Sequence, residues 1–340
     1  MKRIPSLDGL RAISIAAVVV GHVAKALHST AVWGAYGNTG VRIFFVISGY
    51  LITRLLLTEH DRTSTISLRE FYIRRAYRIL PAAFIFIAAG VIIDWREMTW
   101  YHVAAALFYV ANCDYSLPWI FGHLWSLSVE EQFYLLWPSV LKRWYQHRVA
   151  ILFGVMAFSP VLHVVLYYFK VPGGGEALFP VVADNLAIGC LLAMLESRIP
   201  RVPGYVALAM TVAVLLIPFY PARSATRTLF MVFFLHPVFL ASIGGVVLHV
   251  VRRPYYFLNC RPVEWLGRIS YSLYLWQEPF CPNPRFRPAY AIALALATAC
   301  VSYYAVERPA LNMREKKTRD RKGQVSETRS GGVSSASPLQ

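Results

Sequence analysis

Residues 5–22 read PSLDGLRAISIAAVVVGH, an apolar segment with one arginine near its start and one histidine further along. Arg11 and His22 are eleven residues apart, which on a helix is almost three whole turns. Both therefore lie on one helix face, about 16 Å apart along the axis. An ionisable side chain in a membrane span costs roughly 2.5–3.5 kcal/mol on insertion scales, so it usually faces a cavity or a partner. The pair indicates either a polar path into a bilayer, or a snorkelling arginine and a hydrogen-bonded packing histidine.

The whole chain is too apolar for an ordinary soluble domain. Its 340 residues are 57% hydrophobic with a mean hydropathy of +0.47, and the charged residues, only 15%, cluster between long apolar runs. This pattern predicts an all-α, polytopic transmembrane helical bundle that forms a single membrane domain. About ten spans are expected, at roughly 7–27, 39–57, 79–93, 124–141, 149–169, 180–196, 203–219, 228–251, 263–280 and 289–306.

The distribution of basic residues predicts the orientation. A net charge of +16 would suit a nucleic-acid partner, but the basic residues lie in short loops and in the tail, as orientation signals do, so the predicted partner is the lipid bilayer and not nucleic acid. With both termini cytoplasmic in an inner (plasma) membrane, the inner loops hold Arg62, Arg69, Arg74, Arg75, Arg78, Lys142, Arg143, Arg148, Arg198, Arg201, Arg252, Arg253 and Arg261. The outer loops hold a thinner set, Arg96, Lys170, Arg223, Arg227, Arg285 and Arg287.

Three further segments complete the predicted organisation. Residues 101–113 are apolar but short, and we expect a re-entrant or interfacial helix there. Residues 172–176 (PGGGE) are expected to form a flexible outer loop. The membrane domain is predicted to cover 1–311, and the basic, then Ser/Gly-rich residues 312–340 a disordered cytoplasmic tail. The five cysteines show no metal-like spacing, and no metal site is predicted.

The segment FYIRRAYRILP, residues 71–81, places Arg74, Arg75 and Arg78 within about one turn, at the inner mouth of the predicted third span. Guanidinium groups so close repel one another unless an anion lies among them. A multiply phosphorylated ligand fits, because arginine binds phosphate through two parallel hydrogen bonds. The alternative is a topology signal that contacts lipid headgroups.

Two other polar groups interrupt apolar runs. In GHLWSLSVEEQFYLLWP, residues 122–138, His123 and Glu130 are seven residues apart and share a helix face. A carboxylate at Glu130 is expensive unless it binds or relays something, or accepts hydrogen bonds from a neighbouring span. In FFVISGYLI, residues 44–52, Ser48-Gly49 breaks an otherwise apolar helix and permits close approach of a backbone or an acyl chain.

These segments resemble the acyltransferase 3 family of integral membrane acyltransferases, which includes bacterial O-antigen and exopolysaccharide O-acetylases. The resemblance rests on an ordered set of motifs that covers nearly the whole chain except the tail. The set is LDGLRAISIAAVVVGH, FFVISGYLI, YIRRAYRILP, HLWSLSVEEQFYLLWP, ADNLAIGCLLA (183–193), LGRISYSLYLW (266–276) and YYAVERPAL (303–311).

The resemblance implies transfer of an acyl group, usually acetyl, from acyl-CoA to a hydroxyl. It implies that His22 is the catalytic histidine with Arg11 as its motif partner, and that Glu130 matches the acidic position of its segment. It matches Arg75 and Arg78 to the paired cytoplasmic arginines of the family. Many relatives carry a histidine where this chain has Gln277, which is followed by Glu278.

The combined interpretation is an enzyme without a permanently bound cofactor. Acyl-CoA is expected to dock from the cytoplasm at Arg74, Arg75 and Arg78, with its arm along the Arg11 face. His22, whose near-neutral pKa suits the task, then deprotonates the acceptor hydroxyl or becomes transiently acylated. The substrate-binding candidates are Ser48, Gly49, His123 and Gln277.

The predicted acceptor is a sugar hydroxyl on a lipid-linked or surface glycan, or else a macrolide-like small molecule. Some relatives carry an extra extracytoplasmic domain, whereas this chain is expected to act as a lone membrane domain. A transporter of lipid-linked sugars or acyl donors is the alternative, since intramembrane Arg, His and Glu also suit a proton-coupled carrier.

Overall fold

The computed structural model describes residues 4–27, 31–171, 175–220, 224–281, 283 and 286–318, and within these ranges the chain is helical and contains no strand. The first half contains α1 (Pro5–Ala26), α2 (Ala31–Thr63), α3 (Leu68–Ile93), α4 (Trp100–Leu107), α5 (Leu124–Arg143), α6 (Arg148–Tyr168) and α7 (Phe179–Leu195). The second half contains α8 (Gly204–Leu216), α9 (Ala225–Phe230), α10 (His236–Arg252), α11 (Tyr256–Asn259), α12 (Arg261–Arg268), α13 (Ser270–Trp276) and α14 (Pro288–Ser302). Two short π-helical turns are also present. The turn η6 (Met231–Leu235) lies between α9 and α10, and η7 (Tyr303–Glu307) follows α14.

Six helical stretches among the described residues are long and apolar enough to cross a membrane, so the expected count of about ten is not confirmed. They are Pro5–Ala24, Gly34–Thr63, Leu68–Ile93, Tyr145–Tyr168, Ala225–Arg252 and Pro288–Thr318. Two apolar helices, Phe179–Leu195 and Gly204–Phe219, are shorter. The expected span at 124–141 is helix α5, whose glutamates and terminal basic residues set it apart from the apolar six.

The expected spans at 39–57 and 79–93 are shorter than the helices observed there. Helix α2 runs from Ala31 to Thr63 and α3 from Leu68 to Ile93, so both helices include charged residues that lie outside the expected spans. Arg74, Arg75 and Arg78 lie inside α3 rather than in a loop or at a helix mouth. A helix tolerates them there because Arg75 and Arg78 line a polar pocket instead of facing lipid, and Arg74 pairs with Glu59 of α2.

The expected span at 263–280 is wrong as a single helix. It is divided into α12 and α13 at Ile269, and a turn follows α13 through Gln277–Cys281. Gly267, two residues before the division, lets α12 pack closely on α1, since a Cβ there would lie 1.9 Å from the backbone oxygen of Asp8. The turn after α13 returns the side chains of Gln277 and Glu278 to the interior of the bundle.

Helix α2 is the centre of the packing, with α1 on one side and α7 on the other. A Cβ on Gly49 would lie 2.1 Å from the Leu186 oxygen, and one on Gly189 would lie 2.1 Å from the Val46 oxygen. The two helices touch backbone to backbone, which favours association through van der Waals contact in lipid. The expected close approach is thus found between two helices, while the expected break is not, because α2 continues through Ser48-Gly49.

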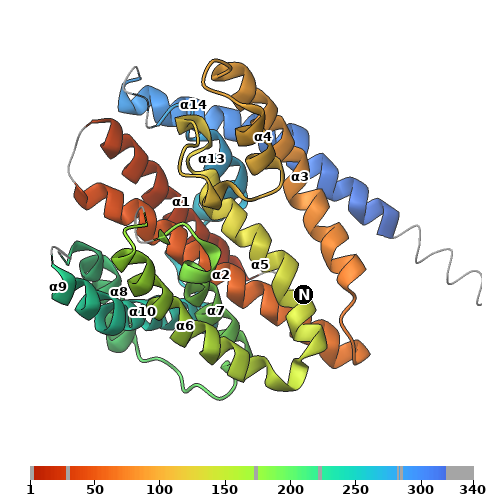
Figure 1. The fold of residues 1–340 in the computed structure, drawn as a ribbon. Helices are drawn as coiled ribbons and strands as arrows, with labels where there is room; N and C mark the ends of the chain where they lie inside the picture. Colours follow the sequence, from red (N-terminus) through yellow and green to blue (C-terminus); the bar gives the residue numbers. More distant parts are fainter. Residues whose placement is uncertain are drawn as a thin grey trace, which may run out of the picture.

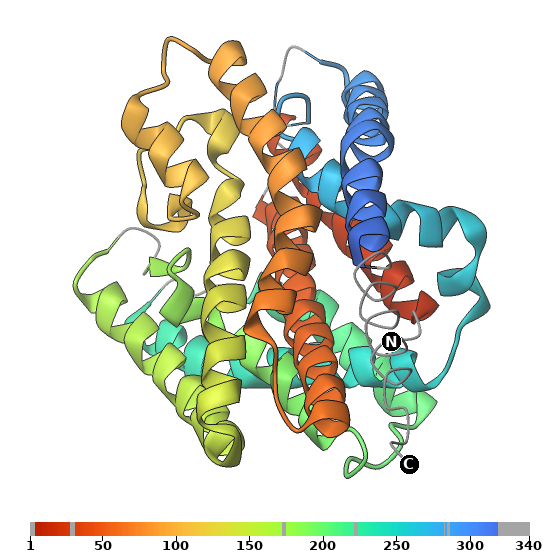
Figure 2. The same cartoon turned by 90° about the vertical axis from the view of Figure 1, so that its right-hand side faces the viewer.

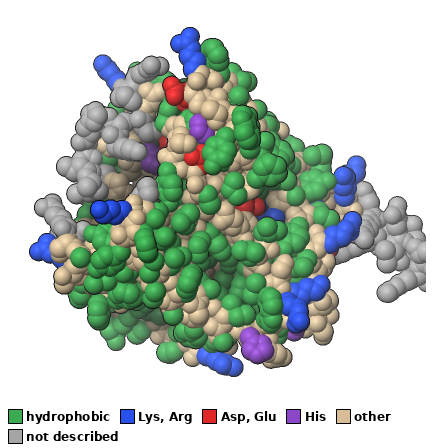
Figure 3. Space-filling view, in the orientation of Figure 1, with side chains coloured by type: hydrophobic (Ala, Val, Ile, Leu, Met, Phe, Trp, Pro, Cys, Tyr) green, Lys and Arg blue, Asp and Glu red, His purple; other side chains and the backbone are tan. Residues whose placement is uncertain are grey.

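The helices form one bundle with a largely apolar exterior. Helix α1 and helix α2 lie side by side in Figure 1, and Figure 2 shows α2, α3 and α5 next to one another with α14 beyond α3. Hydrophobic side chains cover most of the face shown in Figure 3, and Lys and Arg lie mainly near its edges. This surface fits a protein embedded in lipid.

Two peripheral predictions have mixed outcomes. Residues 101–113 contain α4 and a short 3-10 turn, Ala111–Cys113, so this segment is helical but too short to cross a bilayer. The helix that begins at Pro288 continues to Thr318, so residues 312–318 are helical rather than disordered, and Lys317 Nζ donates to the Tyr77 hydroxyl at 3.0 Å. Residues 319–340 of the predicted tail, residues 172–174 of the predicted loop, Arg223 and Arg285 lie outside the described residues.

Candidate functional site

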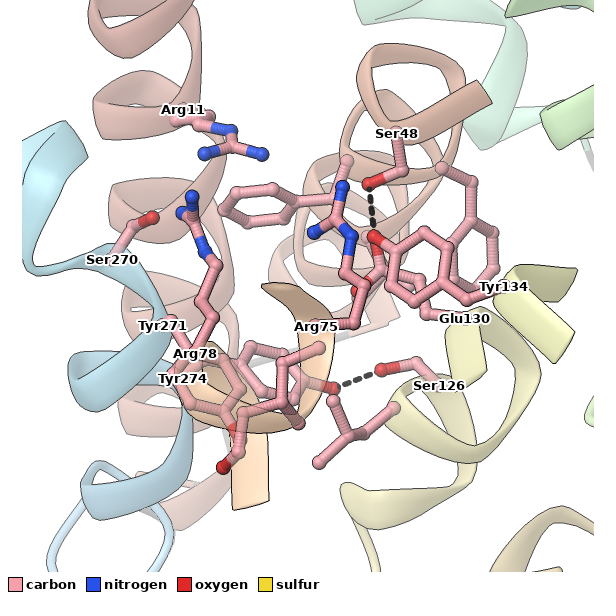
Figure 4. A pocket seen from close by; sticks show the side chains of 15 residues that line it. Arg11, Ser48, Arg75, Arg78, Ser126, Glu130, Tyr134, Ser270, Tyr271 and Tyr274 are labelled. Carbon is pink, nitrogen blue, oxygen red and sulfur yellow. Dashed lines mark hydrogen bonds between the residues drawn. The ribbon is translucent and has the colours of Figure 1, made fainter. Parts of the chain in front are cut away.

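A pocket in the middle of the bundle collects polar side chains from five helices. It is lined by Arg11 of α1, Ser48 of α2, residues of α3, α5 and α13, and apolar side chains such as Phe45. Figure 4 shows Arg11, Arg75 and Arg78 extending into the same space, opposite Ser48, Glu130 and Tyr134. Side chains distant in sequence therefore meet in one chamber, which we call the arginine pocket.

The three arginines give this pocket a concentration of positive charge that favours an anion. No carboxylate of the described residues lies within ion-pair distance of Arg11, Arg75 or Arg78, and Arg11 Nε is buried without a hydrogen-bond partner there. The Arg75 guanidinium lies 4.4 Å from the centre of the Tyr134 ring, a cation–π contact that holds it in place. Uncompensated guanidinium groups in a confined space attract phosphate or another oxyanion.

Glu130 is held by its neighbours in the opposite wall of the arginine pocket. The Ser48 hydroxyl donates to Glu130 Oε1, and the Tyr134 hydroxyl donates to the same oxygen at 3.1 Å. The Tyr134 and Ser48 oxygens are 3.2 Å apart. Glu130 thus does accept a hydrogen bond from a neighbouring helix, and it also faces the arginines as the counter-charge in the pocket.

Arg74 does not join the other two arginines of its motif. Its Nη2 lies 3.2 Å from Glu59 Oε2 of α2, and it does not line the arginine pocket. Gly49 is also outside this pocket, since it faces Leu186 of α7. Arg11, and not Arg74, is the third arginine that lines the arginine pocket with Arg75 and Arg78.

His22 lies in a second polar group, further along α1. Its Nδ1 is 2.7 Å from Gln277 Oε1 and 3.0 Å from Glu278 Oε2, both in the turn after α13. Gln277 Nε2 in turn donates to Glu278 Oε2 at 3.0 Å. Two acceptors surround Nδ1, so the hydrogen-bond network assigns the proton of the neutral imidazole to Nδ1 and the basic lone pair to Nε2.

His123 completes this second group and connects it to the arginine pocket. Its Nδ1 is 3.7 Å from Glu278 Oε2, and its ring centre is 5.3 Å from that of Tyr274. The Tyr274 hydroxyl donates to the His123 backbone oxygen at 2.9 Å and lies 2.5 Å from Ser126 Oγ. Tyr274 and Ser126 both line the arginine pocket, so a wall of shared side chains joins the two groups.

Sequence reasoning passed over Glu278, Tyr134 and Tyr274. Glu278 carried a detectable signal, because a carboxylate in an apolar segment calls for a partner in the same way as Glu130 does. The tyrosines carried none, since aromatic residues are common in any membrane helix. Among the described residues, no group of three His, Cys, Asp or Glu side chains is placed to hold a metal ion.

Comparison with known proteins identifies the family. The profile described as "Acyltransferase domain" matches residues 4–306. The chain is 31% identical over 320 residues to peptidoglycan O-acetyltransferase OatA of Listeria monocytogenes. This alignment covers 82% of this chain and 49% of OatA. It is 30% identical over 369 residues to the Bacillus subtilis protein named "Putative peptidoglycan O-acetyltransferase YrhL", which covers 90% of this chain and 54% of that protein.

The chain therefore spans about half the length of the curated relatives it matches. No solved structure gives a significant match. The family profile covers the motifs that supply the arginine pocket and the His22 group, from Arg11 to Glu278. The chain belongs to the acyltransferase 3 family of integral membrane proteins.

Proposed function

We propose that the chain is a membrane O-acyltransferase that moves an acetyl group from cytoplasmic acetyl-CoA to a hydroxyl of a cell-envelope glycan. The observation that carries this proposal is the pocket with three arginines that form no ion pair with a described carboxylate, together with a histidine further along α1 that contacts the Glu278 carboxylate. The names of the relatives support acetyl transfer to peptidoglycan, which we propose as the acceptor class. A macrolide-like acceptor is the alternative.

The arginine pocket suits the donor. The phosphates of acetyl-CoA would bind at Arg75 and Arg78, which form no ion pair with a described carboxylate, and Arg11 Nε would donate to the same ligand. The pocket lies within the first half of α1 and of α3. If both termini are cytoplasmic in the inner membrane, as the basic loops predict, the donor enters from the side on which acyl-CoA is made.

His22 would act as the general base of the transfer. Nε2 takes the proton of the acceptor hydroxyl while its oxygen attacks the thioester carbonyl, and the carbon–sulfur bond then breaks. The proton on Nε2 passes to the leaving thiolate, which gives CoA and an acetyl ester and restores the neutral imidazole. Glu278 stabilises the imidazolium during this cycle because its carboxylate lies 3.0 Å from Nδ1.

The reaction is tested with the purified full chain in lipid nanodiscs. Acetyl-CoA and de-O-acetylated cell-wall glycan fragments are supplied together, and CoA thiol release and ester-linked acetate are both measured. We expect thiol release to equal ester formation. A transporter of sugars or acyl donors would give no thioester turnover, and transfer without any dependence on the glycan fragments would remove glycans as the acceptor.

A further inference from the structure

A second large cavity lies between α2, α6, α7 and η6, on the far side of α2 from α1. Arg42 of α2, His163 and Tyr167 of α6, Asp184 of α7 and His236 of α10 line it, and Lys170 and Glu176 stand at the ends of the connection between α6 and α7. With both termini cytoplasmic, this connection lies on the outer side. The function proposed above assigns no role to these residues, and we call this space the outer cavity.

The outer cavity is lined by an organised polar network. His236 Nε2 lies 2.8 Å from Asp184 Oδ2, and Asn185 Nδ2 donates to Asp184 Oδ1 at 2.8 Å. The Asp184 side chain is 3% exposed, so this carboxylate is held deep in the wall. His163 lines the same cavity as Asp184 and His236, together with Arg42 and Glu176. Such a network, on a helix embedded in lipid, indicates a bound polar ligand.

The lining chemistry matches a sugar better than a simple ion. Positive groups (Arg42 and Lys170) and negative groups (Glu176 and Asp184) both line the cavity, so it offers hydrogen-bond donors and acceptors without a strong excess of either charge. Hydroxyl groups use both, whereas a phosphate or a metal ion would need one sign. Tyr167 lines the same cavity and is 40% exposed, which leaves an aromatic face for the apolar side of a sugar ring.

The outer cavity and the arginine pocket are neighbours with lining residues in common with one smaller cavity. A smaller cavity shares Arg42, Glu176 and Val182 with the outer cavity and shares Phe45 with the arginine pocket. Phe45 meets Trp125 edge to face, with ring centres 6.1 Å apart, where the small cavity adjoins the arginine pocket. Phe45 and Trp125 therefore lie between the outer cavity and the pocket proposed for the donor.

We propose that the outer cavity binds the saccharide portion of the acceptor, with sugar hydroxyls against Arg42, His163 and the Asp184–His236 pair. This inference rests on the proposed O-acyl transfer, because it is the acceptor of that reaction that occupies the cavity. Helix α2 would then contribute to both sites, since Ser48 lines the arginine pocket proposed for the donor and Arg42 lines the outer cavity.

The first test varies Tyr167, His163 and Arg42 in the full chain in nanodiscs. With acetyl-CoA saturating and de-O-acetylated cell-wall glycan fragments titrated, Tyr167→Leu, His163→Gln and Arg42→Gln should each raise the acceptor KM roughly tenfold or more, while the donor KM stays unchanged. Tyr205→Leu is the matched control, since Tyr205 is 77% exposed on α8 and does not line the outer cavity. An unchanged acceptor KM in all three variants would overturn the proposal.

The second test does not require turnover. Saturation-transfer NMR measures binding of the same glycan fragments to the wild-type chain and to Tyr167→Leu. Loss of fragment binding in Tyr167→Leu supports the saccharide site. If the wild type also shows no acetyl transfer, the proposed function is rejected while the saccharide site is retained. Acetyl transfer by the wild type, together with equal fragment binding by the Tyr167→Leu and Tyr205→Leu chains, would instead reject the outer cavity and leave the transferase standing.

Discussion

Glu278 Oε2 lies 3.0 Å from His22 Nδ1, although 256 positions separate the two residues in the chain. Gln277 Oε1 lies 2.7 Å from the same nitrogen. Gln277 stands at the position where many relatives are expected to carry a histidine, and Glu278 follows it; both contact the imidazole. In the mechanism proposed here the carboxylate acts through His22 without touching the acyl donor, which would make Glu278 a positioning residue.

The first prediction separates the base from its positioning residue. His22→Ala should lower kcat by about 10²–10⁴, the usual contribution of a general base, while the protein still folds and inserts. Glu278→Gln should lower kcat less, move the acidic limb of the pH–rate profile, and leave the donor KM unchanged. Steady-state kinetics across pH, with size-exclusion chromatography as the folding control, measures both. Full activity of a well-folded His22→Ala chain would contradict the assignment.

The covalent route is tested separately on the same residue. The wild-type chain is mixed with radiolabelled acetyl-CoA without acceptor, denatured and separated from free donor. Direct transfer predicts no protein-bound label. Label that is present in the wild type and absent from His22→Gln would show that His22 carries the acetyl group itself.

The second prediction concerns the donor. Arg75→Ala and Arg78→Ala should each weaken acyl-CoA binding by roughly ten- to a hundredfold, which corresponds to about 1.5–3 kcal/mol for a lost charge-assisted hydrogen bond. Lysine at either position should rescue only in part, because it keeps the charge and loses the planar pair of donors. Titration of acyl-CoA in detergent gives the values.

Arg74→Ala is the matched control for the donor experiment. It removes an arginine from the same turn of α3, but Arg74 pairs with Glu59 and does not line the arginine pocket. We expect its donor KM to remain close to that of the wild type. If all three alanine variants lower only the yield of inserted protein, then these arginines are lipid or topology signals and the donor site lies elsewhere.

The third prediction tests the contact between α2 and α7. Gly49→Ala and Gly189→Ala each place a methyl group against the backbone of the facing helix, and overpacking of this kind destabilises by about 1–3 kcal/mol. Both variants should lower the thermal midpoint of the protein in detergent. Gly154→Ala is the control, since a Cβ at Gly154 meets nothing within 4 Å. Equal midpoints for all three would show that the glycines do not limit the packing.

The fourth prediction concerns topology. Reporter fusions after residues 60, 145, 255 and 325 should report the cytoplasm, and fusions after residues 34, 96, 118 and 174 should report the outer side. The expectation follows from the excess of Lys and Arg in the predicted inner loops. A cytoplasmic signal after residue 118 would mean that residues 101–113 cross the membrane, and the side of every later loop would reverse.

Helical periodicity predicts which residues of one helix share a face, but it does not predict contacts between different helices. It placed Arg11 on a polar face of α1, and it placed Arg75 and Arg78 within one turn of α3, because such relations depend only on residue spacing. It could not separate Arg74 from them, since the ion pair with Glu59 is a tertiary contact between α2 and α3. Glu278 remained without a role for the same reason, because its partner is on a different helix.

The expected span count is not confirmed, for a related physical reason. A hydropathy window measures how well a segment suits lipid, and α5 carries Glu130, which faces the arginine pocket instead. The segment at 263–280 is apolar enough to suggest a span, yet the helix is interrupted at Ile269. A hydropathy window does not measure the contacts inside the bundle that distinguish such segments from spans.

The glycine contacts of α2 have a kinetic consequence. Arg42 of the outer cavity and Ser48 of the arginine pocket are six residues apart on a helix whose backbone packs against α7, so these residues lie about 9 Å apart along the axis. If the donor and the acceptor bind as proposed, one rigid helix carries part of both sites, and the substrates lose their translational freedom on binding to it. A methyl group at Gly49 would therefore lower the effective molarity of the acceptor hydroxyl even in molecules that remain folded.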